Sequence, residues 1–328
     1  MSRKSTRSRG RSRFEFSSFV KAVGLIALTL VVAFLCVLAL KHGQGSQSSQ
    51  RTVTGEAQTP AAPTSAAGAT PTPAATTQPV SGTAVPATQI ITAVDESSAY
   101  RAAVGSCPAG GSAIETTRDG GATWTSFDAS GQLGVGDIRA IGSSGNGYAF
   151  FTGLDLADCT SMVAGHSYSS GAEWSVASTI PDTVWSIDPA NTQSLSGPGG
   201  LTVDAPCSLV QVVAGGENAV AGICADGTVT RSADSGSTWT QSDPVQGIDA
   251  LAFSGDNLVA GSVGDASCEE GVAIRVMDSS LGVTKQSCAP AGAAPAGQTA
   301  LSHASDGTLW LLAGDSVLRS SDNGESWG

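Results

Sequence analysis

Six cysteines are the most conspicuous side chains in this sequence that could do chemistry. They are Cys107, Cys159, Cys207, Cys224, Cys268 and Cys288, and a seventh, Cys36, lies inside an apolar run. Such a set suits either metal ligation or disulfide formation. No Cys-x-x-Cys pair occurs and the three histidines are scattered, so we predict disulfides and no metal site. An even number of cysteines is typical of an oxidising compartment.

Motifs that hold nucleotides or build common catalytic centres do not occur. The sequence has no P-loop, no dinucleotide fingerprint, no His-Glu-x-x-His and no Gly-x-Ser-x-Gly elbow. We therefore predict no cofactor and no catalytic residue, and turn to the elements that position the remaining candidates.

The first 40 residues have the pattern of a membrane anchor. Residues 1–21 carry seven cations and one anion, and residues 22–40 carry no charge. At about 1.5 Å per helical residue, the uncharged run spans about 28 Å, the thickness of a hydrocarbon core. Few cations follow it, so we expect the basic arm in the cytoplasm and the rest outside. A cleaved signal peptide would need a shorter run and a small-x-small site, and Leu40, Lys41 and His42 follow instead.

Charge and composition divide the remainder. Of 16 cations eight lie in residues 1–41, and of 28 anions one does, which leaves a net charge of −19 beyond the anchor. The basic arm could contact nucleic acid or anionic lipid, but topology signalling is its simpler role, and the acidic remainder suits no nucleic-acid partner. Residues 41–88 are rich in Ala, Thr and Pro, a composition that predicts an extended linker.

A repeat dominates residues 89–328. The pattern S/T-x-D-x-G-x-S/T-W occurs at residues 117–124, 232–239 and 320–327. A weaker copy at residues 167–174 has Ser169 in place of the Asp, and a decayed copy surrounds Asp278. The three complete copies contain these pattern residues: Asp119, Gly121, Trp124, Asp234, Gly236, Trp239, Asp322, Gly324 and Trp327.

This pattern resembles the Asp-box, or bacterial neuraminidase repeat, of sialidase-like β-propellers. The Asp carboxylate can accept bonds from N–H groups of its own turn, Gly supplies a positive φ, and Trp starts the next strand and buries a large ring. We expect an all-β propeller of about five or six four-stranded blades, with the Asp-box residues structural.

Two segments depart from the repeat period. Residues 182–206 are too few for a blade between Ser169 and Asp234 and are expected to form an inserted loop containing Trp185. The sequence stops at Gly328, just after Trp327, so we expect residues 80–85 to supply the missing outer strand of the last blade.

The blade topology places the cysteines on the face opposite the Asp-boxes. On that face we expect pairs 207–224, 268–288 and 107–159. It also gathers a candidate binding face: Asp155, Asp158, Trp185, Asp265, Glu269 and Glu270. An acidic rim without a ligand is the alternative. On the Asp-box face, Arg231, Arg275 and Arg319 are expected to pair with carboxylates.

The resemblance leaves two functions open. A sialidase site needs three arginines, a Tyr with a Glu, and an Asp, and its first Arg belongs to an Arg-Ile-Pro motif. Here Ala102 and Ala103 follow Arg101. The chain is therefore closer in character to non-catalytic members such as the photosystem II assembly factor family. We predict an extracytoplasmic module that binds a protein or carbohydrate; the alternatives are a glycoside hydrolase and a purely structural stalked protein.

Overall fold

Six antiparallel sheets form the part of the chain that the structure describes. The structure is a computed structural model, which describes residues 83–328 apart from 106, 180–183 and 217. Sheet 1 contains β1 (Gln89–Ala93), β2 (Ala99–Ala103), β3 (Ala113–Thr117) and β4 (Thr125–Asp128). Sheet 2 contains β5 (Val135–Gly145), β6 (Tyr148–Asp155), β7 (Met162–Ser167) and β8 (Ser175–Val176). The short helix α2 (Ala129–Leu133) joins these two sheets.

The remaining four sheets follow in chain order. Sheet 3 contains β9 (Ser186–Asp188), β10 (Asn191–Gly197) and β11 (Leu201–Asp204), with the 3-10 turn η1 (Pro198–Gly200). Sheet 4 contains β12 (Leu209–Ala214), β13 (Val220–Cys224), β14 (Thr228–Ser232) and β15 (Thr240–Pro244). Sheet 5 contains β16 (Ile248–Ser254), β17 (Asn257–Val263), β18 (Val272–Met277) and β19 (Val283–Ala289). Sheet 6 contains β20 (Thr299–His303), β21 (Leu309–Ala313) and β22 (Ser316–Ser320).

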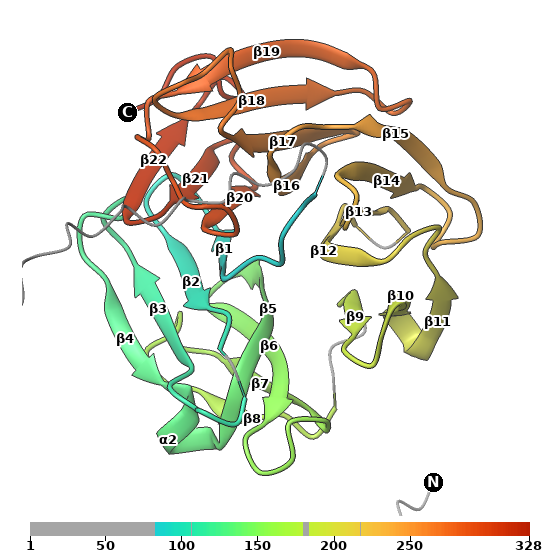
Figure 1. The fold of residues 1–328 in the computed structure, drawn as a ribbon. Helices are drawn as coiled ribbons and strands as arrows, with labels where there is room; N and C mark the ends of the chain where they lie inside the picture. The colour runs from blue at the N-terminus through green and yellow to red at the C-terminus, as the bar shows by residue number, and fades with distance from the viewer. Residues whose placement is uncertain (1–82, 106, 180–183, 217) are drawn as a thin grey trace, which may run out of the picture. The chain divides into compact units, whose positions relative to one another are not determined.

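The sheets are arranged as a six-bladed propeller around a central axis (Figure 1). Hydrophobic clusters lie between neighbouring sheets. Phe151 and Trp174 belong to the cluster between sheets 1 and 2, and Ile91 and Trp310 to the one that joins sheet 6 back to sheet 1. Further clusters join sheets 3 and 4, 4 and 5, and 5 and 6. Among the described residues, no such cluster joins sheets 2 and 3.

The turn between the third and fourth strands is held by the side chains of the repeat. We call residues 117–124, 167–174, 232–239 and 320–327 the repeat turns. In the first, Asp119 accepts hydrogen bonds from the Thr123 N–H at 2.9 Å and the Thr123 hydroxyl at 2.5 Å. The Thr117 hydroxyl accepts from the Gly121 N–H at 2.9 Å. The same bonds recur in the turns that contain Asp234 and Asp322. The repeated sequence therefore builds one repeated turn.

Each repeat turn packs against the preceding sheet. Gly121 has φ +90°, and a Cβ added there would lie 2.8 Å from Val317 of sheet 6. A Cβ on Gly236 would lie 2.7 Å from Val203 of sheet 3. The tryptophans occupy matching positions, each in the cluster between its own sheet and the one before: Trp124, Trp174, Trp239 and Trp327. Gly and Trp are thus required by packing between sheets as well as by the turn.

Residues 186–204 correct the blade prediction. They form sheet 3, where β10 pairs with β9 and β11, and they are not an inserted loop. The sequence conceals this sheet because β10 reads Asn-Thr-Gln-Ser-Leu-Ser-Gly, with one large apolar residue, and because it lacks the Asp and Trp of a repeat turn. The propeller accordingly has six blades, the larger of the two expected numbers.

The predicted closing strand, residues 80–85, is also corrected in its described part, since residues 80–82 lie outside the described residues. The Gly328 N–H donates to the Arg319 carbonyl at 2.9 Å and its carbonyl accepts in return at 3.0 Å, so this residue begins the outer edge of sheet 6. Residues 84–88 lie elsewhere: the Ala84 N–H donates to the Ala225 carbonyl of sheet 4, and the Thr88 N–H to Gly297 before sheet 6. Buried Ala84 packs between sheets 4 and 5, which draws this segment away from the edge of the ring.

The three predicted disulfides are confirmed. Cys107–Cys159, Cys207–Cys224 and Cys268–Cys288 have Cα separations of 5.6, 5.7 and 5.5 Å. The first joins loops of sheets 1 and 2, and the others brace sheets 4 and 5. Closing the 17-residue separation of the second contributes about 3 kcal/mol in the chain-entropy model.

The predicted membrane anchor lies outside the described residues, as do the basic arm and residues 41–82 of the linker. In the described part of the chain, no helix has the length and apolar character that a membrane crossing requires.

Candidate binding surfaces

The two ends of the propeller carry different loops. The turn face carries the repeat turns and the turns between first and second strands. The cystine face carries the loops between second and third strands, with the disulfides. The predicted binding residues Asp155 and Asp158 and the set Asp265, Glu269 and Glu270 belong to cystine-face loops of sheets 2 and 5. These sheets are three positions apart in a ring of six, so the structure does not bring the two groups together.

Several of these carboxylates accept hydrogen bonds from residues of their own loop and so stabilise its conformation. Asp158 accepts from the Ser161 hydroxyl at 2.6 Å and the Ser161 N–H at 2.8 Å, and these bonds lower its pKa to about 2. Asp155 accepts from the Ala157 N–H at 2.7 Å. Asp265 pairs with Arg275 and with Ser267. In the described residues, no group of His, Cys, Asp and Glu could hold a metal ion.

The three predicted arginines have different partners. Arg231 donates to the Asp256 carbonyl and Arg319 to the Glu96 carbonyl, each at 2.7 Å and each in the next sheet. Of the three, Arg275 alone pairs with a carboxylate, Asp265 of a cystine-face loop. Arg231 and Arg319 therefore brace neighbouring blades through carbonyl oxygens, which differs from the expected carboxylate pairing.

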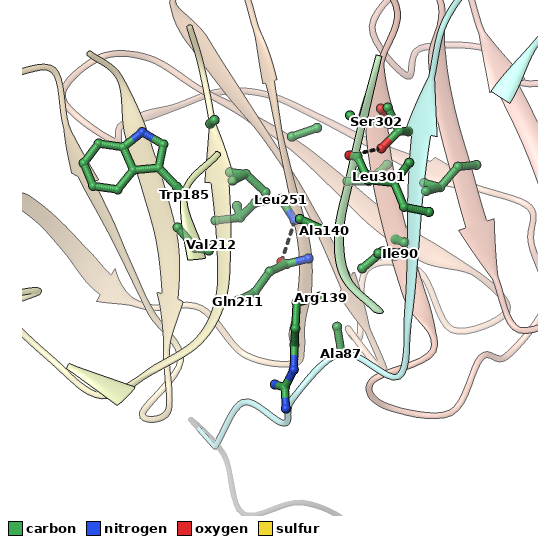
Figure 2. A pocket seen from close by; sticks show the side chains of 18 of the residues that line it. Ala87, Ile90, Arg139, Ala140, Trp185, Gln211, Val212, Leu251, Leu301 and Ser302 are labelled. Atoms are coloured by element: carbon green, nitrogen blue, oxygen red, sulfur yellow. Dashed lines mark hydrogen bonds between the residues drawn. The ribbon is translucent and has the colours of Figure 1, made fainter. Parts of the chain in front are cut away.

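A cavity of about 410 Å³ lies at the centre of the ring, lined by the innermost strands of all six sheets. Figure 2 shows its wall, which includes Ile90, Val212, Leu251 and Leu301. Ala87 of the segment before β1 also lines it. Trp185 is 4% exposed, packs in the cluster between sheets 3 and 4 and lines the same cavity. Sheet 3 thus places Trp185 at the centre and not in an exposed loop.

Polar side chains of the innermost strands join neighbouring sheets. The Gln211 side chain of sheet 4 accepts from the Leu251 N–H of sheet 5 at 3.1 Å (Figure 2). The Thr92 hydroxyl of sheet 1 donates to the Ile141 carbonyl of sheet 2 at 2.7 Å. Ser302 of sheet 6 accepts from the Ala93 N–H of sheet 1 at 2.8 Å. These groups hold neighbouring sheets of the propeller together. The other side chains of the cavity wall are mainly apolar.

Two buried aspartates stand at the start of innermost strands. Asp137 is 1% exposed, and burial raises its pKa against the opposing effect of Arg139, whose Nε lies 2.6 Å away. Burial also raises the pKa of Asp249, which accepts from the Gly297 N–H of sheet 6 at 2.5 Å. Asp137 thus pairs within its own strand β5, and Asp249 binds the segment before sheet 6. The second oxygen of each, Asp137 Oδ1 and Asp249 Oδ2, has no hydrogen-bond partner among the described residues.

Aromatic residues gather on sheet 2 near the turn face. We call Phe150, Tyr148, Tyr168 and His166 the aromatic strip. Successive ring centroids are 6.1, 5.2 and 5.0 Å apart. Tyr168 is 76% exposed, and Phe150 lines the central cavity. The strip therefore runs from the cavity toward the rim.

The aromatic strip lies beside a second hollow. This hollow, of about 580 Å³, is at the turn face and is lined by small residues, among them Ser143, Gly145 and Gly255. Ser143–Gly145 end strand β5, and the turn at residues 146–147 leads from them into Tyr148. In the sequence, the tyrosines stood out only as possible nucleophiles. Residues two apart in a strand share a face. The spacing of Tyr148 and Phe150, and of His166 and Tyr168, is therefore the sequence signal that could have revealed the strip.

Comparison with known proteins gives no family. No protein-family model matches the chain, and no curated protein matches it. Among solved structures, a YCF48 bound to D1 peptide is 19% identical, with 76% of this chain and 68% of that one covered and a TM-score of 0.25. YCF48 from Cyanidioschyzon merolae is 15% identical, with 75% and 85% covered and a TM-score of 0.41. An Aleuria aurantia lectin in complex with Fucalpha1-6GlcNAc is 10% identical, with 76% and 96% covered and a TM-score of 0.47. At these values the propeller assignment rests on the six sheets themselves.

Proposed function

We propose that this chain is a membrane-tethered binding module, with residues 22–40 as the anchor and the propeller outside the cytoplasm. The charge asymmetry across residues 1–41 supports the orientation, and the three disulfides suit an oxidising compartment. We further propose that the three repeat turns that contain Asp119, Asp234 and Asp322 are Asp-boxes, because their Asp, Gly and Trp residues have the roles that this repeat requires.

The aromatic strip is the observation that carries the binding function. Large aromatic side chains are enriched at protein interfaces because they combine apolar area with a polar tip. Tyr168 keeps 76% of its surface exposed although each Trp of a repeat turn is packed between sheets. The exposed ring of Tyr168, supported by the half-buried rings of Tyr148, Phe150 and His166, is suited to contact with a partner.

The arrangement of the sialidase-type residues argues for binding and against hydrolysis. Tyr100 is 3% exposed and packs edge-on against Trp174. Arg101 pairs with Glu115 at 2.7 Å and lies 4.1 Å from the Trp124 ring centroid. These residues hold sheet 1, whereas a hydrolase needs its Tyr, Arg and carboxylates to converge on one open site.

The test is affinity capture with the full-length protein in detergent, with a Tyr168→Ala variant beside the wild type. We expect a specific protein partner that the wild type retains and the variant loses. Turnover of a fluorogenic sialoside by the wild type, abolished by Tyr148→Phe, would contradict the proposal and favour a glycoside hydrolase. Retention of no protein would contradict it as well.

A further inference from the structure

The aromatic strip lies on the face of sheet 2 that points toward sheet 3, where the described residues of the two sheets share no hydrophobic cluster. Side chains alternate along a strand, so Phe151, packed toward sheet 1, places Phe150 on the side of sheet 3. A hydrophobic cluster lies between the two sheets of each of the other five adjacent pairs. In the described part of the chain none lies between sheets 2 and 3, and β9 of sheet 3 has three residues.

The exposed part of this face is restricted to one end. Farther along the same face, toward the cystine face, Thr152 and Ala164 are 0% and 3% exposed. Toward the turn face, Tyr168 is 76% exposed, while Tyr148, Phe150 and His166 are half-buried. Residues 143–147 and 168–170 lie beside these rings and are half-buried or exposed. This area is continuous with the hollow on the turn face, which Ser143 and Gly145 line.

The two turns that support the strip are braced. The Ser170 N–H donates to the Gly147 carbonyl at 2.9 Å and so joins the turns to each other. Arg118 of sheet 1 donates to the carbonyls of Ser169 and Ser170 at 3.1 and 3.2 Å. The Ser143 hydroxyl donates to the Tyr148 carbonyl at 2.9 Å. A surface held in this way loses little conformational entropy on binding.

The composition of this surface favours a polypeptide ligand without charge. Residues 143–147 read Ser-Ser-Gly-Asn-Gly and residues 167–171 read Ser-Tyr-Ser-Ser-Gly, so these segments contain no charged side chain. The guanidinium of Arg118 borders them, but it donates to the Ser169 and Ser170 carbonyls. Tyr with Ser, Gly and Asn is the composition of antibody recognition loops, where Tyr gives rigid contact area and the small residues give adaptable hydrogen bonds.

The ring geometry narrows the ligand further. Adjacent rings are inclined by 41°, 45° and 65°, which leaves wedge-shaped spaces between them. Pyrrolidine rings fit such spaces, and polyproline II segments dock in aromatic-lined grooves. These segments also present unpaired carbonyls, and the Tyr hydroxyls and the Asn146 amide can donate to them.

We propose that the aromatic strip binds an uncharged, proline-rich segment of a partner protein in the polyproline II conformation. The proposal rests on the binding function proposed above and specifies its ligand. Tyr168 and Tyr148 act as the anchors, and the ligand continues into the small-residue hollow of the turn face.

Fluorescence anisotropy of a labelled polyproline peptide, titrated with the full-length protein in detergent micelles, tests this proposal. We expect saturable binding that Tyr168→Ala weakens about tenfold or more, as for an aromatic anchor. Tyr148→Ala should weaken it as well. Val283→Ala is the matched control, because Val283 is 52% exposed on sheet 5, away from the strip, and it should bind like the wild type. A Gly/Ser peptide of equal length should not bind.

Different results overturn different claims. Equal binding by the wild type and Tyr168→Ala, or no binding of polyproline, overturns the proline-rich ligand, and so does displacement of a captured partner by a neutral oligosaccharide but not by polyproline. In each of these cases a partner retained in the capture experiment leaves the binding function standing. Sialoside turnover without a retained partner overturns the binding function itself.

Discussion

The two faces of sheet 2 carry similar residues in different environments. On the side of sheet 1, Phe151 and Trp174 are buried in a shared cluster and their ring centroids are 5.6 Å apart. On the side of sheet 3, Tyr148 and Tyr168 are almost as close, at 5.2 Å, yet Tyr168 is 76% exposed. The difference comes from the repeat turns, because Trp174 of sheet 2's own repeat turn fills the space toward sheet 1, whereas the three-stranded sheet 3 has no repeat turn to fill the space toward sheet 2. One face holds the ring together, and the other is the one that we propose recognises a partner.

The largest expected effect is on the buried face. Trp174→Ala removes a ring that is 6% exposed and the bond from its indole N–H to the Gly171 carbonyl at 3.1 Å. Truncation of a large buried aromatic residue costs about 3–5 kcal/mol. Chemical denaturation of the full-length protein should show this loss. A loss below about 1 kcal/mol would mean that the cluster between sheets 1 and 2 does not hold the ring.

A smaller effect is expected at the repeat turn of sheet 2. Gly171 has φ +82°, and an added Cβ would lie 2.5 Å from the Thr116 hydroxyl and 2.7 Å from the Tyr100 ring. We expect Gly171→Ala to lower the free energy of unfolding by about 2–4 kcal/mol, from backbone strain and overpacking together.

Gly200→Ala is the matched control for this turn. Gly200 has φ +78° with no atom within 4 Å of an added Cβ. Gly200→Ala therefore introduces backbone strain without a steric clash, and it should lower the free energy of unfolding by about 1 kcal/mol. Equal losses in the two variants would show that the turn does not pack against sheet 1.

Acid should weaken the turns that contain Asp more than the turn of sheet 2. Hydrogen bonds from Thr123 and Thr117 lower the pKa of Asp119 to about 2, and equivalent bonds lower the pKa of Asp234 and Asp322. A carboxyl whose folded pKa lies below its unfolded value of 3.8 stabilises the protein above that value. This stability is lost as the pH falls from about 4 toward 2.

Denaturation midpoints measured across that pH range check the sign. Asp119→Asn should make the fall less steep, because one titrating group is removed. Ser169→Ala, at the corresponding position of sheet 2, also removes an acceptor, for the Glu173 N–H at 2.8 Å, but should leave the slope unchanged. A steeper fall in Asp119→Asn would contradict the assignment of this carboxylate.

The smallest expected effect is on the exposed face. Tyr168→Ala removes a ring from the surface and should change the free energy of unfolding by less than about 0.5 kcal/mol. Thermal or chemical denaturation beside Trp174→Ala completes the comparison. A loss of several kcal/mol would show that the aromatic strip is part of the core.

The sequence predicted the parts of the fold that depend on local chemistry. The spacing of Asp119, Gly121 and Trp124 and their repeats predicted the turns and the packing of Trp between sheets. The positions of cysteines around hairpins predicted the disulfides. Sheet 3 escaped prediction because its polar strand β10 pairs through backbone bonds that no side-chain pattern indicates. The acidic residues of the candidate binding face lie in cystine-face loops, but in sheets 2 and 5, because the number of blades sets their separation. Their binding role stays a prediction.

The aromatic strip shows a further limit of the sequence. Strand alternation places Tyr148 and Phe150 on one face, but their exposure depends on the size of sheet 3, which the sequence conceals. Burial of Tyr100 depends in the same way on Trp174 of the next sheet. The exposure of a side chain on one sheet is therefore set by the adjacent sheet of the propeller.

Nitration of tyrosine with tetranitromethane, mapped by mass spectrometry, tests the contrast between the two faces most directly. The chain has three tyrosines, of which Tyr100 is 3% and Tyr168 76% exposed. We predict that Tyr168 is nitrated first, that Tyr100 is modified only on unfolding, and that polyproline protects Tyr168. Nitration of Tyr100 as fast as Tyr168 in the folded protein, or protection of Tyr168 without any ligand, would contradict the account.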